Sequence, residues 1–519
     1  MKKVLSILFI TTFLFADKPI TGKNIINLEY ATQPALNSDG SRIAYVRIVS
    51  PEEGSKSRSS FREIWVVDGD GSNQRKFTSA PINSWSPQWA PNGNLTFLSS
   101  RKEHNKSTQV YSIPINGGEA YPITDYKDGI GSYKWSPNGK WIAFTSREKE
   151  SAKVKKMKKD GYDMIVMGKE HLYNRLWIFN IESNTYKKIY RQDLNVSLFE
   201  WAPDSESIVF QASEKVNVDL EYLESSIYLV KIPSGNPKKV TDTPGKLSSM
   251  SISPNNKQLA FLGATSYNDP LAQSIYVAEI KTGKSKLITD NFKESFIDVD
   301  WIDDQTVIGL SQRGTKTVLS AIFLNNNSSE KVFNQNDILT PKEIITSISY
   351  HRNTKQFLFT ANSHRHHNEV FLGLYGSKKM QRITFLNPSL NNIKLAKQET
   401  VSWKAEDGIT IEGVLTYPLS YRGGKRYPLI LQIHGGPEGV SQDGWNTRTT
   451  YPVQLLAANG YFVLEPNYRG SAGRGVAFSK LDHDDLGGQE FNDVLKGIDH
   501  LVDLGYVDKD KVGTGGWSY

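Results

Sequence analysis

The stretch that decides the fold is Val512-Gly513-Thr514-Gly515-Gly516-Trp517-Ser518-Tyr519. Its last four residues match the first four positions of G-x-S-x-G, a sharp turn that exposes a nucleophilic serine between a strand and a helix. Gly516 supplies the small neighbour that so tight a turn requires. A serine hydroxyl is a poor nucleophile at neutral pH, so it needs a nearby base and a site for the developing oxyanion. The pattern indicates Ser518 as a nucleophile. The motif alone is weak evidence, and it becomes strong only if a strand, a helix and a second strand precede it.

The chain before this turn alternates apolar strands with helices. Residues 427–433 and 461–464 are nearly continuous apolar runs, as expected for strands buried in a parallel sheet. A helix is expected between them over residues 453–459. A longer helix is expected over residues 489–504, where apolar residues recur at helical spacing. These apolar residues are Phe491, Val494, Leu495, Ile498, Leu501 and Val502.

Strand, helix, strand and serine turn in this order predict the first half of an α/β-hydrolase sheet. Residues 391–519 are therefore expected to form the N-terminal part of such a domain. In this fold the catalytic acid and histidine follow the serine along the chain. We expect both to lie beyond Tyr519, which would make this chain inactive and C-terminally truncated, either as a fragment of a longer enzyme or as the product of a gene interrupted by a stop.

The motif His434-Gly435-Gly436-Pro437 directly follows the first apolar strand. At this point the fold supplies amides to an oxyanion hole, and the two glycines let the backbone approach a substrate. A plain glycine turn is the alternative interpretation. Because His434 precedes the serine, we do not expect it to be the catalytic base.

A second motif, residues 467–475, contains a G-x-x-G-x-G string. A nucleotide-binding loop is disfavoured, since no helix suited to phosphate binding follows. We interpret the segment as an active-site loop that includes Tyr468 and Arg469. Asp493 is a candidate for orienting it, through either Arg469 or Arg474.

A repeated unit occupies the chain from Ala35 to about Thr384. In each repeat an aromatic or apolar residue precedes a turn of the Ser/Ala-Pro-Asn-Gly type, and short strands follow. The middle turn residues are Asp39, Asn92, Asn138, Asp204, Asn255, Asp304 and Asn353. Four short strands per repeat predict a seven-bladed β-propeller, which with a lead-in segment would occupy residues 17–390. The alternative, a β-sandwich, would require the spacing to be coincidental.

The N-terminus has the pattern of a secretory signal peptide. Lys2 and Lys3 precede an apolar run over residues 4–15, and the small residue Ala16 follows. We expect cleavage after Ala16 and a periplasmic or secreted protein, with an uncleaved anchor as the alternative. No stable membrane insertion is expected after cleavage, because no later stretch is long and apolar enough to cross a bilayer.

Charge and metal-ligand patterns point to no further partner. The net charge is +7, and one dense basic run, residues 153–159, is interpreted as a solvated loop rather than a nucleic-acid site. The adjacent pair Glu52-Glu53 is interpreted as solvated surface. His364, His366 and His367 cluster without a supporting carboxylate or cysteine pattern, so we expect neither a metal nor a cofactor.

Residues 31–519 resemble serine peptidases of the prolyl oligopeptidase family, in its acylaminoacyl-peptidase-like and bacterial dipeptidyl-peptidase-like branch. The resemblance rests on the motifs at residues 434–437, 467–471, 505–508 and 516–519, which read HGGP, NYRGS, GYVD and GWSY. It implies a propeller that caps the hydrolase, so that only short or unfolded peptides reach the serine. It also implies that Ser518 is the nucleophile.

By the same resemblance the backbone amides of Tyr519 and Gly436, next to Gly435, form the oxyanion hole. Acylpeptide, dipeptidyl and general oligopeptide cleavage all stay open. An esterase of the same fold is an alternative, and so is an inert peptide-binding propeller. The sequence predicts no oligomeric state.

Overall fold

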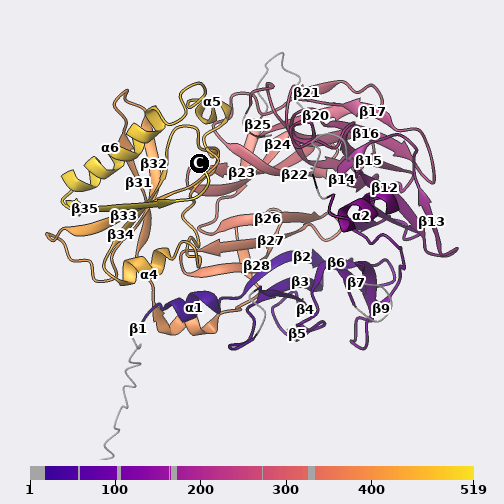
Figure 1. Cartoon of the computed structure of the whole chain (residues 1–519), viewed down its shortest axis with the longest axis horizontal. Coiled ribbons are helices and arrows are strands. Elements are labelled where there is room, and N and C mark those ends of the chain that lie inside the picture. The colour runs from indigo at the N-terminus through magenta and orange to yellow at the C-terminus, as the bar shows by residue number, and fades with distance from the viewer. Residues whose placement is uncertain are drawn as a thin grey trace, which may run out of the picture.

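The computed structural model describes residues 18–55, 59–101, 107–162, 164, 172–269, 271, 273–324 and 334–519. The expected signal peptide, residues 1–16, lies outside these ranges. The described chain forms a ring of four-stranded sheets beside a separate five-stranded sheet with helices (Figure 1). The predicted seven-bladed propeller and α/β-hydrolase domain are thereby confirmed.

Each blade is one antiparallel sheet of four strands that follow one another in the chain. The blades comprise, in order, β2 (Tyr30–Leu36), β3 (Arg42–Val49), β4 (Phe61–Asp68) and β5 (Arg75–Lys76); β6 (Ser84–Trp89), β7 (Leu95–Ser99), β8 (Gln109–Ile113) and β9 (Tyr121–Pro122); β10 (Ser132–Trp135), β11 (Trp141–Arg147), β12 (Asn174–Asn180) and β13 (Thr185–Lys188); β14 (Asn195–Trp201), β15 (Ser207–Ser213), β16 (Ser226–Lys231) and β17 (Lys238–Thr241); β18 (Leu247–Ile252), β19 (Gln258–Gly263), β20 (Ser274–Glu279) and β21 (Ser285–Leu287); β22 (Ser295–Asp303), β23 (Thr306–Arg313), β24 (Lys316–Phe323) and β25 (Asn334–Leu339); β26 (Ile344–His351), β27 (Gln356–Ser363), β28 (His366–Leu374) and β29 (Met380–Arg382).

The repeated tryptophan before the blade turn joins neighbouring blades. The Trp89 indole N–H donates to the carbonyl of Ala35 in the preceding blade, over 3.0 Å. Trp201 and Trp301 repeat this bond into the blades that precede theirs. The bond satisfies the polar edge of a large side chain that is otherwise packed between sheets, so the repeat in the sequence is a repeat of blade-to-blade contacts.

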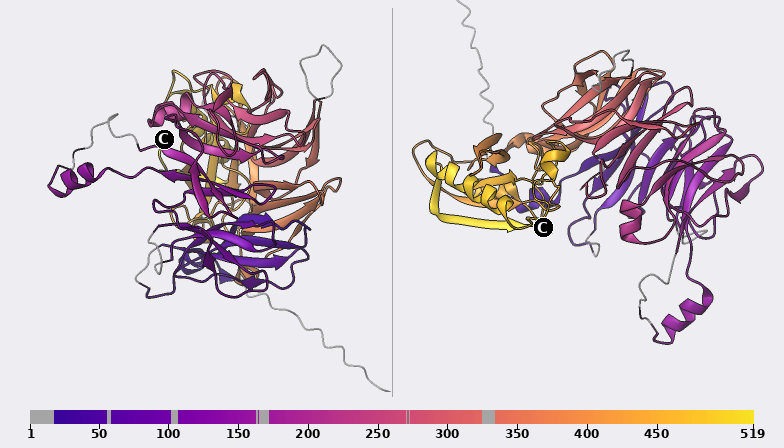
Figure 2. Two further views of the ribbon diagram at one scale, coloured as in Figure 1. Left: turned by 90° about the vertical axis from the view of Figure 1, so that its right-hand side faces the viewer. Right: turned by 90° about the horizontal axis from the view of Figure 1, so that it is seen from above.

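The third blade carries the insertion expected from the sequence, between β11 and β12. Its described part includes α2 (Ala152–Lys159), which stands away from the ring (Figure 2). The basic run was expected to be a loop, and this is wrong: Ser151 caps a helix by accepting a hydrogen bond from the Val154 backbone N–H. The run is solvated, since no residue of α2 is buried. The fourth blade carries α3 (Val218–Leu223) between β15 and β16.

The hydrolase sheet has the strand order β31-β32-β34-β33-β35. Its strands are β31 (Gln398–Lys404), β32 (Thr410–Thr416), β33 (Tyr427–Ile433), β34 (Phe462–Asn467) and β35 (Val507–Gly516), and its helices are α4 (Val453–Ala458), α5 (Val476–Ser479) and α6 (Gln489–Asp503). β33 is parallel to β34 and β35, whereas β32 is antiparallel to β34. The helix-containing crossovers place β33 between the two strands that follow it.

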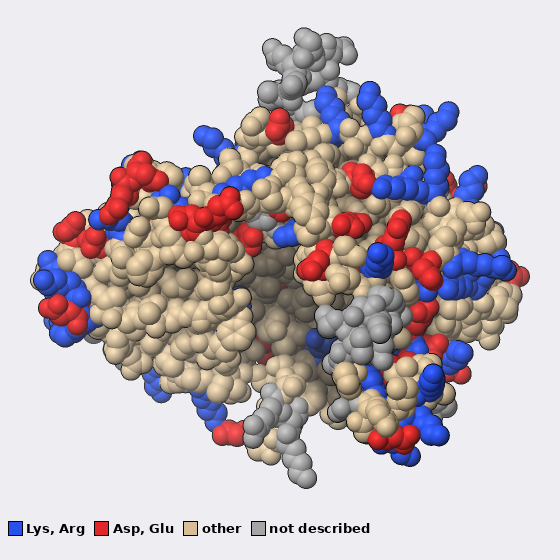
Figure 3. Space-filling model, turned by 45° about the horizontal axis from the view of Figure 1, so that its top comes forward, with Lys and Arg blue, Asp and Glu red and all other residues tan. Residues whose placement is uncertain are grey.

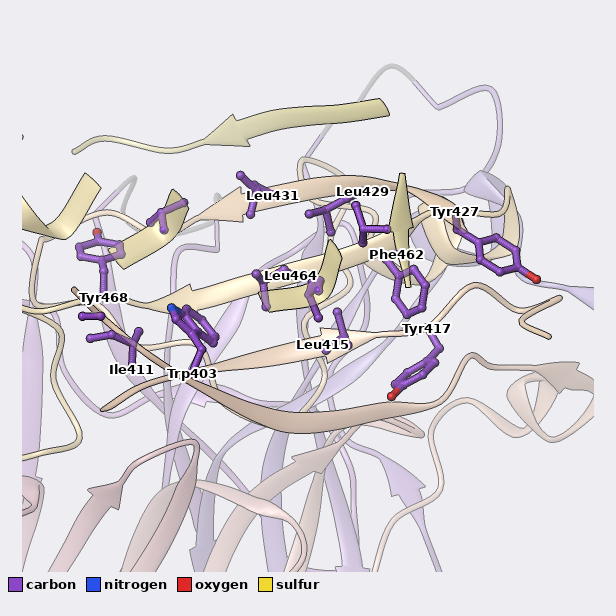
Figure 4. Packing of buried hydrophobic residues seen from close by; sticks show 14 of the residues in the cluster. Trp403, Ile411, Leu415, Tyr417, Tyr427, Leu429, Leu431, Phe462, Leu464 and Tyr468 are labelled. Carbon is purple, nitrogen blue, oxygen red and sulfur yellow. The ribbon is translucent and has the colours of Figure 1, made fainter. Parts of the chain in front are cut away.

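The core of this domain lies between the sheet and α6 (Figure 4). The sheet contributes the buried residues Leu429, Leu431 and Leu464 to it, and α6 contributes the buried residue Leu501. Fully burying each such side chain stabilises the fold by about 1.5–3 kcal/mol. Within the described residues, no helix is both long and apolar enough to cross a membrane.

The N-terminal lead-in was expected to accompany the propeller, but it packs on the hydrolase side. β1 (Lys18–Pro19) pairs in parallel with β30 (Ile393–Lys394), and α1 (Gly22–Ile26) follows. Ile20 and Ile25 are buried in one cluster with Leu390, from the 3-10 helix η1 (Pro388–Asn392), and Trp445. Where the chain enters and leaves the propeller, the Glu29 N–H donates to Asn387 over 2.9 Å and the Asn387 side-chain amide donates back to the Glu29 carbonyl over 2.6 Å.

The two domains meet through the later blades. The Gly314 N–H, in the β23–β24 turn, donates to the carbonyl of Gly473 over 2.7 Å, and the Gly473 N–H donates to the Ser295 hydroxyl. Lys316 forms an ion pair with Asp443. Away from these contacts the surface is hollowed between the propeller and the hydrolase domain (Figure 3).

Candidate active site

Ser518 lies directly after β35, in a strained conformation. Its φ is 67°, a value that non-glycine residues rarely adopt and that marks strain at functional turns. β35 pairs with β33 so that Gly516 lies opposite Ile433. Because the two strands are parallel, the serine turn and the His434-Gly435 segment emerge side by side at the same edge of the sheet.

Gly435 packs directly against the serine turn. A β-carbon on Gly435 would lie 2.8 Å from the Ser518 Cβ and 2.5 Å from the Trp517 carbonyl oxygen, so any side chain there would displace the turn. Gly436 has φ 138°, and a β-carbon on it would lie 2.2 Å from the Glu438 backbone nitrogen. Both positions require glycine, and they bring this loop into contact with Ser518.

Two backbone donors beside the serine are unpaired. Among hydrogen bonds between described residues, none uses the backbone N–H of Gly436 or that of Tyr519. Amides that are not engaged in the fold are available to an oxyanion. The resemblance assigned the oxyanion hole to these two N–H groups, and this assignment stays a prediction; Ser518 beside them is exposed.

His434 is a structural member of this site. Its ring stacks on Tyr468 with centroids 4.6 Å apart, and its Nε2 lies 3.1 Å from the Ser471 hydroxyl. Burial of the imidazole lowers the pKa of His434 to about 4, so the ring is neutral at physiological pH. Within the described residues, no histidine forms a hydrogen bond with Ser518.

Arg469 is the residue that Asp493 orients. The Arg469 guanidinium donates to both carboxylate oxygens of Asp493, over 2.9 and 2.8 Å, and its backbone N–H donates to one of them over 3.0 Å. Both side chains are buried, and the hydrogen bonds to Asp493 raise the pKa of Arg469. Arg474, the other candidate, instead donates to the Thr410 carbonyl and lies over the Phe478 ring.

Sequence reasoning missed one residue of the site, Glu490. Its carboxylate accepts a hydrogen bond of 2.5 Å from the hydroxyl of Tyr519. The available signal was its place in the first turn of a helix, where acidic residues are favoured, but nothing in the sequence linked it to Tyr519.

An apolar cavity of about 380 Å³ opens beside this contact, between α6 and β35. Its lining includes Glu490 and Tyr519, together with Tyr468, Phe491, Val494 and Leu495. Phe491 and Leu495 are 57% and 40% exposed, so the apolar face of α6 that the sequence predicted is covered only in part.

His367 of the histidine cluster and Glu53 of the Glu52-Glu53 pair contact residues outside this site. His367 stacks on Tyr30, with ring centroids 4.3 Å apart, and burial lowers its pKa to about 4. Glu53 forms an exposed ion pair with Lys23. In the described ranges, no group of three or more residues has the composition of a metal site.

Comparisons with known proteins show which sequences this chain resembles. Residues 447–519 match the prolyl oligopeptidase family, and residues 138–260 match the N-terminal region of dipeptidyl peptidase IV. An uncharacterized peptidase, YuxL of Bacillus subtilis, is 26% identical over 527 residues, covering 97% of this chain and 79% of that protein. Dipeptidyl-peptidase 5 of Porphyromonas gingivalis is 22% identical over 544 residues, covering 96% and 75%.

Among solved structures, an acylaminoacyl peptidase in complex with Z-Gly-Gly-Phe-chloromethyl ketone has a TM-score of 0.73 and 18% identity, covering 96% of this chain and 75% of that one. This likeness shows the same pairing of propeller and hydrolase. Together with the match of residues 447–519 and the peptidase relatives, it shows which proteins this chain resembles: serine peptidases of the prolyl oligopeptidase family.

Proposed function

We propose that the protein cleaves short peptides, as an oligopeptidase or an exopeptidase, with Ser518 as the nucleophile. The observation that carries this proposal is the position of Ser518, exposed and at φ 67° after β35, beside the backbone N–H groups of Gly436 and Tyr519, to which no described residue binds. A nucleophile next to two preorganised donors is the arrangement that acyl transfer requires.

In the proposed reaction the Ser518 Oγ attacks the peptide carbonyl as a base removes its proton. The N–H groups of Gly436 and Tyr519 stabilise the oxyanion of the tetrahedral intermediate, and its collapse expels the amine and leaves an acyl-enzyme. Water then attacks the acyl-enzyme and releases the acid. His434 is unsuited to act as the base, because its Nε2 is engaged with Ser471. Activation of Ser518 therefore needs a base other than His434.

The propeller is proposed to restrict the substrate. Ser518 belongs to the hydrolase domain, which meets the propeller through the turns of the later blades, and the surface is hollowed between the two domains (Figure 3). The hollow is proposed to admit an extended peptide and to exclude a folded protein. The peptidase relatives and the peptide-derived inhibitor bound to a structural relative favour a peptide substrate.

The first test is labelling with a fluorophosphonate, which reacts with activated serines. Wild-type protein extended by any coding sequence that follows Tyr519 should be labelled, and its Ser518→Ala variant should not. Labelling that persists in Ser518→Ala would overturn the assignment of the nucleophile.

Substrate panels separate the alternatives. Hydrolysis of short peptide amides supports the peptidase, whereas activity confined to small acyl esters supports an esterase of the same fold. Peptide binding without hydrolysis by the extended protein would support an inert binding propeller. Acyl-blocked and free N-termini, compared on one peptide, separate acylpeptide from dipeptidyl cleavage.

Secretion through residues 1–16 is part of the same proposal. It is supported by the basic start and the apolar run that precedes Ala16. N-terminal sequencing of the mature protein should begin at Asp17, and an intact Met1 in the cell membrane would instead indicate an anchor.

A further inference from the structure

The side chain of Tyr519 reaches back from the serine turn to the start of α6. Its hydroxyl donates to Glu490 Oε1 over 2.5 Å, and the backbone N–H of Gly487 donates to the same hydroxyl over 3.1 Å. Tyr519 is the residue after Ser518 in the chain. A contact made by its phenol therefore bears on the orientation of its backbone N–H.

Glu490 is held rigidly where it makes this contact. The residue is 4% exposed, and its carboxylate accepts hydrogen bonds from the backbone N–H groups of Gly487 and Gly488. It lies in the first turn of α6, where the helix dipole favours a negative charge. Two amides and the helix start thus hold the carboxylate through contacts that do not involve Tyr519.

The helix that carries Glu490 is also tied to the other active-site loop. Asp493, one turn further along α6, binds Arg469. Next to Arg469, Tyr468 holds the His434 carbonyl through its hydroxyl over 2.7 Å, and its ring lies 6.5 Å from that of Tyr519. One helix therefore bears on both sides of the oxyanion site.

We propose that Glu490 is a positioning residue for the oxyanion hole: by binding the Tyr519 phenol, it fixes the Tyr519 backbone N–H relative to that of Gly436. This inference rests on the proposed function, since it assumes that these two groups receive the oxyanion. The phenol stays a donor at working pH, because burial and the nearby Glu490 raise the pKa of Tyr519 to about 12.

The competing role for Glu490 is structural, as the cap of α6. The two roles separate in a pair of variants. Tyr519→Phe removes only the hydroxyl and leaves the amides of residues 487 and 488 bound to Glu490. Glu490→Gln alters both contacts. Glu369→Gln is the matched control, because Glu369 is fully buried in the propeller strand β28 and accepts hydrogen bonds from Arg382 and Thr384.

The experiment uses the full-length active enzyme and a peptide anilide substrate. Tyr519→Phe and Glu490→Gln should each lower kcat by about ten- to a hundredfold with KM within about twofold, as small misplacements of catalytic groups do. The Ki of a peptide trifluoromethyl ketone, whose adduct places an oxyanion in the hole, should rise by the same factor. The Ki of a product peptide should not change. The double variant should be no slower than the slower single variant, because both break one contact.

Wild-type kcat in Tyr519→Phe overturns the inference, even if Glu490→Gln fails to fold. So does a Glu490→Gln variant that, like Glu369→Gln, loses thermal stability but keeps kcat and the ketone Ki. The outcome for the proposed function is read separately: activity that survives in Ser518→Ala refutes the nucleophile. Inactive Ser518→Ala with normal Tyr519→Phe refutes only the role of Glu490.

Discussion

The hydroxyl of Tyr468 donates a 2.7 Å hydrogen bond to the carbonyl oxygen of His434, and the two rings stack with centroids 4.6 Å apart. Tyr468 follows β34 and His434 follows β33, so this contact locks together two loops that leave neighbouring strands. Gly435, next in the chain, packs on Ser518. The position of Ser518 thus depends on Tyr468, which forms no hydrogen bond with it among the described residues.

Tyr468→Phe should weaken catalysis while leaving the stack in place. The His434 carbonyl would lose its partner, at a cost of about 1 kcal/mol, which corresponds to about a fivefold lower kcat if the loss falls on the transition state. The change in kcat is measured by steady-state kinetics with a peptide anilide. Tyr421→Phe, at a tyrosine of the same domain core, is the control. An unchanged kcat in Tyr468→Phe would show that the two loops are aligned by other contacts.

Asp493→Ala should destabilise the hydrolase domain strongly. It would leave the Arg469 guanidinium buried without its main partner, and breaking a buried ion pair in this way costs about 3–5 kcal/mol. Thermal unfolding followed by circular dichroism should show an earlier transition. Lys496→Ala removes exposed ion pairs from the same helix and should leave that transition in place. Equal shifts of the unfolding temperature in Asp493→Ala and Lys496→Ala would show that the ion pair of Asp493 with Arg469 does not contribute more to stability than the exposed pairs do.

Gly435→Ala should abolish fluorophosphonate labelling of the extended protein without unfolding it. The added methyl group would lie 2.8 Å from the Ser518 Cβ and would push the serine turn away from the Gly436 amide. Gly423→Ala serves as the control, because a β-carbon there has no neighbour within 4 Å. Normal labelling of Gly435→Ala would mean that the loop and the turn are not in contact in solution.

Glu465 should make stability fall as the pH rises. Burial raises the pKa of this carboxyl from 4.5 to about 8, so the folded state holds its proton more tightly than the unfolded state does. The resulting stabilisation is complete below pH 4.5 and is lost progressively up to about pH 8. Asn446 donates to Glu465 over 2.8 Å, and a glutamine could still accept that bond.

The measurement is the melting temperature between pH 5 and 9. The melting temperature of Glu465→Gln should increase relative to that of the wild type as the pH rises to about 8, and the difference should stay constant above that pH. Glu182→Gln, at an exposed carboxylate in a propeller turn, should track the wild type throughout. A constant difference between Glu465→Gln and the wild type would show that Glu465 does not titrate in this range.

Local chemistry made much of this molecule predictable. The blade turns could be found because each needs the same residue types, such as Gly139 at φ 70° and Asn256 at φ 60°. The serine turn could be found for a similar reason, since its motif specifies a backbone shape. Predictions of this kind depend on residues that are neighbours in the chain.

Contacts between distant segments were not predictable in the same way. Nothing in the sequence near Tyr519 indicates Glu490, because their hydrogen bond depends on how α6 packs against β35. The partial exposure of Phe491 has the same origin: helical spacing predicts an apolar face but not what covers it. The pairing of β1 with β30 likewise joins segments on either side of the whole propeller.

The reciprocal hydrogen bonds between Glu29 and Asn387 give the molecule the topology of an insertion. From Lys18 the described chain forms β1 and α1 on the hydrolase side, leaves at Glu29 to build the ring, and returns at Asn387 to the point from which it left. A domain whose two ends lie close together can be removed or replaced without moving the flanking segments of the other domain. Joining residue 28 to residue 388 through a short flexible linker would excise the entire ring and keep β1 beside β30.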